Sequence, residues 1–146
     1  LAADVDAPVL KLKISGFDTH EYQLNEHGGL LEDLSEALGD LRTALRQSGH
    51  WDTTMIMTYS EFGRRATENR SRGTDHGTAA PHFLLSGSIR GGLYGQDPDL
   101  EDLIDGDLRY TLDYRSLYDL LLSGWFGLPH NRFSSYAENW LYDITP

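Results

Sequence analysis

The stretch LLEDLSEALGDLRTALRQSG, residues 30–49, is the segment from which the fold is most readily inferred. Its leucines recur every three or four residues, at Leu30, Leu34, Leu38, Leu41 and Leu45. Most charged side chains fall on the opposite face, and Gly49 follows as a typical helix stop. We therefore expect an amphipathic helix over residues 28–48 that packs on a sheet.

Two β-prone stretches flank this helix. Residues 9–14 (VLKLKI) alternate apolar and lysine side chains, and residues 53–59 (TTMIMTY) form a short apolar run. Strand, helix and strand in that order predict a βαβ unit and a parallel sheet. In such sheets ligands gather at the carboxyl ends of the strands, so we expect functional groups just after residues 14 and 59.

The remaining segments complete an α/β chain that forms a single domain or a fragment of one over residues 1–146. Residues 81–85 (PHFLL) predict a third strand, and residues 113–126 predict a second helix capped by Asp113. The other segments are predicted to be a polar loop (63–80), a glycine-rich turn or hairpin (86–95), an acidic connector (96–112) and a tail that packs as a cap (130–146). The expected fold is a partial, mostly parallel sheet with flanking helices.

Composition narrows the class of function. The chain has 146 residues, the length of one domain, and 23 acidic against 12 basic side chains give a net charge of −11. That charge repels phosphate backbones and disfavours a nucleic-acid partner. The absence of cysteine excludes disulfides and thiolate metal sites. No apolar run reaches the ~20 residues of a membrane span. Because the chain opens on Leu1, we expect part of a longer or processed protein.

Three short clusters combine a carboxylate with a histidine or an arginine in glycine-bounded loops. They are Asp18-Thr19-His20, Ser60-Glu61-Phe62-Gly63-Arg64 and Thr74-Asp75-His76-Gly77. Carboxylate oxygen and imidazole nitrogen together suit Zn²⁺, Mn²⁺ or Fe²⁺, whereas carboxylates alone suit Ca²⁺ or Mg²⁺ better. The plainer interpretation is that the clusters are solvated turns and surface ion pairs, and the spacing alone does not exclude it.

Single residues in these clusters allow several roles. Arg64 could hold a carboxylate ligand in place, bind an anionic oxygen, or remain a solvated charge. Ser60 is not predicted to be a hydrolase nucleophile, because residues 58–62 (TYSEF) lack the G-x-S-x-G pattern. Residues 90–95 (RGGLYG) match no phosphate-binding glycine motif and predict a tight turn.

Five motifs in order resemble the DUF1501 family. They are GFDTHEYQ, MIMTYSEFGRRATEN, GTDHGTAAP, GGLYG and TLDYRSLYDLLLSGWFG. The resemblance covers about residues 9–128. The resemblance implies a place in the alkaline phosphatase/sulfatase-like superfamily, and therefore the C-terminal portion of an alkaline-phosphatase-like fold with divalent metals at the strand ends. It also implies an exported or periplasmic protein, because family members often carry a twin-arginine export signal.

The same resemblance implies a ligand set. Asp18, His20, Glu61 and His76 would hold one or two divalent cations (Zn, Mn, Fe or Ca), with Asp75 as a further ligand or as a partner of one. One departure is that a phenylalanine, residue 62, stands where the superfamily usually has a ligand histidine. The superfamily's nucleophile and first aspartate ligand lie nearer the N-terminus, so we expect the rest of a parent chain to supply them.

The resemblance favours a metal-dependent hydrolase of phosphate or sulfate esters. An anionic ester would be the small-molecule substrate, and Arg64 would orient Glu61 or bind the anion. The alternative is an exported, non-catalytic binding or assembly module that keeps the fold. A third interpretation is a purely structural metal site with no open coordination position.

Overall fold

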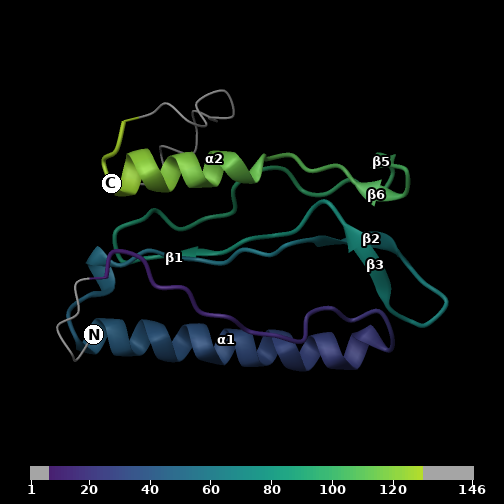
Figure 1. Cartoon of the computed structure of the whole chain (residues 1–146), viewed down its shortest axis with the longest axis horizontal. Helices are drawn as coiled ribbons and strands as arrows, with labels where there is room; N and C mark the ends of the chain where they lie inside the picture. The colour runs from purple at the N-terminus through teal and green to yellow at the C-terminus, as the bar shows by residue number, and fades with distance from the viewer. Residues whose placement is uncertain (1–6, 130–146) are drawn as a thin grey trace.

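The computed structural model describes residues 7–129, in which two helices lie along opposite sides of a set of short strands (Figure 1). The elements in chain order are α1 (Gln23–Gln47), η1 (Trp51–Thr53), β1 (Ile56–Met57), β2 (Gly63–Glu68), β3 (Thr74–Gly77), β4 (Leu84–Leu85), β5 (Leu103–Ile104), β6 (Asp107–Leu108), α2 (Tyr114–Asp119) and η2 (Leu120–Trp125). Among these residues, the strands pair in three two-stranded antiparallel ladders, β1 with β4, β2 with β3 and β5 with β6.

The long amphipathic helix is confirmed as α1. It ends where predicted, because Gly49 adopts a φ of 75° and the amides of Gly49 and His50 donate to the carbonyls of Arg46 and Leu45. It begins five residues earlier than expected, at Gln23, and therefore includes two consecutive glycines in its first turns. Helical glycine costs ~1 kcal/mol relative to alanine, which is why the sequence indicated a later start.

The second predicted helix is also confirmed, as α2 and its π-helical continuation η2. Asp113 caps it as expected, since its carboxylate accepts the Arg115 amide at 2.9 Å. The buried side chains Leu117 and Leu120 pack against β1 and β4 through Met57 and Leu84. This contact forms a buried apolar cluster, and Leu45 of α1 is the other buried apolar side chain of the described residues. Neither helix there combines the length and the apolarity that a membrane crossing requires.

The predicted parallel sheet is wrong for the described residues. Ile56 pairs with Leu85 and Met57 with Leu84 in an antiparallel ladder, so residues 53–59 and 81–85 contribute only two strand residues each. Residues 9–14 form no strand, and their apolar side chains are largely exposed. Without a strand before α1 there is no βαβ unit, and these antiparallel pairs do not support an alkaline-phosphatase-like arrangement.

Two segments predicted to be irregular contain hairpins instead. Residues 63–80 hold β2 and β3, in which Arg64 lies directly opposite His76. The connector 96–112 holds β5 and β6, joined at Asp105-Gly106. Both of these turn residues have positive φ, as the Asp-Gly turn of a tight hairpin requires. Residues 86–95 are irregular, as expected of a turn, and the predicted tail 130–146 lies outside the described residues.

Candidate metal centre

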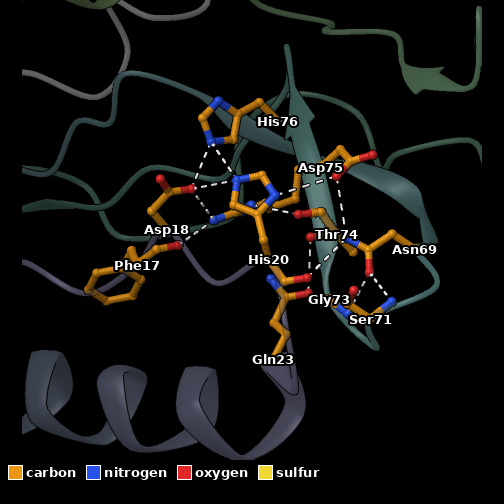
Figure 2. A network of polar contacts seen from close by, with 11 residues as sticks. Phe17, Asp18, His20, Gln23, Asn69, Ser71, Gly73, Thr74, Asp75 and His76 are labelled. Atoms are coloured by element: carbon orange, nitrogen blue, oxygen red, sulfur yellow. Dashed lines mark hydrogen bonds and ion pairs between the residues drawn. The ribbon is translucent and has the colours of Figure 1, made fainter.

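Three polar side chains from distant parts of the chain meet beside the β2–β3 hairpin (Figure 2). Asp18 and His20 come from the loop before α1, and His76 comes from β3. Asp18 Oδ1 lies 2.9 Å from His20 Nε2 and 2.7 Å from His76 Nε2, and the two Nε2 atoms are 3.2 Å apart. One carboxylate oxygen and two imidazole nitrogens therefore converge on one point. We call Asp18, His20 and His76 the metal cluster.

The backbone brings the two halves of this cluster together. The amides of Tyr22 and Gln23 donate to the carbonyls of Ser71 and Arg72, at 3.0 and 2.9 Å. Gly73 lies so close to the loop that a Cβ there would sit 2.2 Å from the carbonyl oxygen of His20. The tip of the β2–β3 hairpin is therefore docked on the residues that lead into α1.

Arg64 joins the same two segments through its side chain. Its guanidinium donates to the carbonyls of Phe17 and Thr74 at 2.6 and 2.7 Å, and to Asp18 Oδ1 at 3.2 Å. The side chain is only 17% exposed. Of the three roles that the sequence left open, these contacts favour holding the carboxylate of Asp18 in place.

Aromatic stacking orients the histidine on β3. The ring of Phe62 lies parallel to that of His76, with centroids 3.6 Å apart and an interplanar angle of 8°. Arg64 in turn lies over Phe62, 5.0 Å from its centroid. The phenylalanine at the position where the resemblance implies a histidine thus supports His76 from its face.

The two aspartates of the site favour the ionised form. The contact with His76 lowers the pKa of Asp18, and the charges of His20 and Arg64 lower it further. The Asn69 amide lowers the pKa of Asp75, with His20 as the second cause. Both carboxylates are solvent-accessible, so these shifts are not a store of folding energy.

The spacing of the metal cluster fits a divalent cation. In a tetrahedral zinc centre, bonds of ~2.0–2.1 Å place neighbouring ligand atoms about 3.3 Å apart. The three separations here lie between 2.7 and 3.2 Å, so a small outward movement admits an ion. Two imidazoles and one carboxylate are donors that suit Zn²⁺, Mn²⁺ or Fe²⁺.

The structure separates the predicted site residues into three groups. Asp18, His20 and His76 form the cluster, while Arg64 and Asp75 contact it. Glu61 is exposed and is not one of the grouped ligands. Its role in metal binding stays a prediction. The hydroxyl of Ser60 donates to the Phe62 carbonyl at 2.9 Å.

Sequence reasoning missed Asn69. Its side-chain oxygen accepts the amides of Ser71 and Gly73, at 2.9 and 3.1 Å, and its side-chain nitrogen donates to the carbonyl of His20 at 3.0 Å. The available signal was an asparagine four residues before a glycine in a polar segment, a pattern typical of side-chain-stabilised turns. That pattern predicts a turn but does not name its distant partner.

Comparison with known proteins supports one family. The model of the family described as "Protein of unknown function (DUF1501)" matches residues 1–126, which is most of the chain. Neither the curated proteins nor the solved structures contain a significant match. The match bears out the resemblance at the level of the family.

Proposed function

The chain belongs to the DUF1501 family, and from that premise we propose that it carries the divalent-cation site of a metal-dependent hydrolase of phosphate or sulfate esters. The observation that carries this proposal is the convergence of Asp18 Oδ1, His20 Nε2 and His76 Nε2 within one cluster. Three protein ligands leave a coordination position open, as catalytic centres do and structural zinc sites do not. A bound cation would polarise the ester oxygen and stabilise the charge that develops there.

The chain's own residues have distinct tasks in this scheme. Asp18, His20 and His76 hold the cation, and Arg64 keeps the Asp18 carboxylate directed at it. Phe62 stacks on the His76 ring and so fixes the orientation of that ring. Because all three hydrogen bonds of Arg64 go to protein atoms, we assign it a positioning role and not one of binding the ester.

We further propose that protein outside residues 1–146 supplies the nucleophile and encloses the ester. The side chains of Asp18, His20 and His76 are 59%, 43% and 47% exposed, so the cluster lies open on this surface. Catalytic metal sites usually lie in a dry, shaped cavity. The implied twin-arginine export is part of the same proposal, and fractionation of cells that express the complete protein tests it.

The test of the site is metal content and affinity in the complete protein and its variants. Asp18→Asn, His20→Gln and His76→Gln should each remove most of the metal, because each deletes one ligand of three. His50→Gln is the matched control, since the described hydrogen bonds of His50 run through its backbone to Leu45 and Thr53. Equal metal content in all four variants and the parent would reject the site.

The test of the activity is turnover of an aryl phosphate and an aryl sulfate. Metal-dependent release of the aryl alcohol that disappears in His76→Gln supports the hydrolase. Phe62 favours the alternative of a non-catalytic binding or assembly module, because its ring occupies the face of His76 at a position where the resemblance implies another ligand. Stoichiometric metal in the complete protein without turnover of either ester supports that alternative.

A further inference from the structure

We propose that residues 9–14 (VLKLKI) are a docking strand, on which an extended segment of the protein outside residues 1–146 pairs through backbone hydrogen bonds. That segment carries acidic side chains opposite Lys11 and Lys13 and apolar side chains opposite the residues between them. The inference rests on the longer protein proposed above, but it does not depend on a bound metal.

The backbone of residues 9–14 has no partner among the described residues. The segment is neither helix nor strand, and within residues 7–129 no hydrogen bond joins its N–H or C=O groups to another residue. An extended segment with a row of unpaired N–H and C=O groups is a template for pairing with another strand. The backbone of residues 9–14 is therefore free to accept one.

The side chains of the segment have the pattern of a half-buried strand but lack a cover. Leu10, Leu12 and Ile14 alternate with Lys11 and Lys13, and successive side chains of an extended chain point to opposite faces. Leu10 and Leu12 are 70% and 77% exposed, and Ile14 is 45% exposed. A neighbouring run of exposed apolar side chains with polar residues beside it is typical of an interaction site.

Contacts with the rest of the fold hold the segment in place. The ammonium group of Lys11 lies 5.3 Å from the centroid of the Tyr59 ring. Gly16 lies against α1, where an added Cβ would be 3.0 Å from a methyl group of Leu30. Figure 1 shows the segment as the purple trace that runs between α1 and the strands. Because the fold already presents the template, a partner strand loses less free energy in ordering it.

Charge selects the occupant, because Lys11 and Lys13 are the only lysines of the chain. Antiparallel pairing of two copies about Leu12 would place Lys11 opposite Lys13, and like charges directly opposite each other destabilise a strand pair. A second copy is therefore disfavoured. Neither lysine forms a salt bridge within residues 7–129, although the Tyr59 hydroxyl and, more weakly, Glu61 raise the pKa of Lys11. Carboxylates on a partner strand would pair with both.

The position of the segment favours the longer protein as the source of that strand. Ile14 stands four residues before Asp18, the first residue of the metal cluster. A strand paired with residues 9–14 therefore lies beside the loop that carries Asp18 and His20. One docked segment would cover the exposed leucines and bring the outer protein next to the cluster that it is proposed to enclose.

The experiment is amide hydrogen exchange in the longer protein, followed residue by residue by NMR. Because a single neighbouring strand bonds every second residue, we expect protection of either the even-numbered or the odd-numbered amides of residues 9–14. Their exchange should be slower than in an unstructured peptide of the same sequence by on the order of 100-fold. Residues 1–146 alone should show no protection at these amides.

Charge variants of the longer protein supply the second measurement. Lys11→Glu combined with Lys13→Glu should reduce the protection at least ~10-fold, because it places like charges across the strand pair. Lys11→Arg combined with Lys13→Arg keeps the charge and should keep the protection. The matched control is Arg46→Glu combined with Arg90→Glu, which makes the same change of charge at two exposed arginines and should also keep it.

Three results would overturn the inference. They are unprotected amides at residues 9–14 in the longer protein, equal protection in the two lysine double variants, and equal protection in residues 1–146 alone, which would place the partner in a second copy or in this chain. Metal content is measured separately on the same samples. Alternating protection in a longer protein that binds no metal rejects the proposed function and supports the docking strand.

Discussion

Gly73 shows how closely the site depends on single atoms. A Cβ at this position would lie 2.2 Å from both the carbonyl carbon and the oxygen of His20, closer than any real contact. Because both obstacles are backbone atoms, the hairpin tip must move away from the loop before α1. The residue is thus required for the docking that brings His76 to Asp18 and His20.

Gly73→Ala should therefore lower both stability and metal affinity. Forced overpacking costs ~1–3 kcal/mol, which urea unfolding of the complete protein would detect. Gly91→Ala is the control, since an added Cβ there meets nothing within 4 Å and the φ is not positive. Parental stability and metal affinity in Gly73→Ala would show that the close approach of Gly73 to His20 is not needed.

The ligands were more predictable from sequence than the residues that position them. Asp18, His20 and His76 belong to short sequence patterns that combine a carboxylate with an imidazole. These residue types indicate metal binding from the sequence alone. Asp75 was recognised as a candidate, but the sequence could not show that its carboxylate lies near Nδ1 of His20. Asn69 was missed because its partner is the carbonyl of a residue 49 positions earlier, and any residue type supplies a carbonyl.

At the scale of elements, the first turn of α2 depends on an ion pair as well as a cap. Asp113 accepts both the amide of Arg115 and its Nε, at 2.9 and 2.8 Å. The Arg115 side chain is the main cause that lowers the pKa of Asp113 below its ordinary value of 3.8. A lowered carboxylate pKa adds stability that is present above the ordinary value and is lost as the pH falls through the lowered one.

Asp113→Ala should cost ~1 kcal/mol of unfolding free energy at neutral pH, because alanine cannot cap the helix. Asp113→Asn should keep the cap but lose the ion pair, and its stability should fall less between neutral pH and pH ~3. Denaturant unfolding of the three proteins over that range measures both effects. A parent and an Asp113→Asn variant with the same dependence on pH would contradict this account.

Helices were predictable here because their signals are local. The leucine repeat and Gly49 defined most of α1, and Asp113 defined the start of α2. Strand pairing was not predictable, because the apolar run 53–59 does not encode the direction or position of its partner strand. The β5–β6 hairpin carried the local signal Asp105-Gly106, which the acidic character of the connector obscured.

At the scale of the whole molecule, the described residues leave many large apolar side chains exposed. Within residues 7–129, the buried apolar side chains are Leu45, Leu117 and Leu120. Leucines such as Leu10, Leu12 and Leu24 remain at least 70% exposed.

Residues 1–146 on their own should therefore bind a hydrophobic dye and self-associate as concentration rises. Fluorescence of the bound dye and sedimentation velocity at several concentrations measure these properties, with the longer protein proposed above as the comparison. A monomer that binds no dye and unfolds cooperatively would show that the exposed apolar side chains need no cover.

The central claim is that Asp18, His20 and His76 hold a divalent cation, and the most direct test is the metal content of the complete protein. Purification without chelators or an affinity metal, followed by elemental mass spectrometry, avoids both loss and contamination. The account predicts a stoichiometric equivalent of Zn, Mn, Fe or Ca that His76→Gln loses and His50→Gln retains. The absence of stoichiometric metal, even after each cation has been added back, would contradict it.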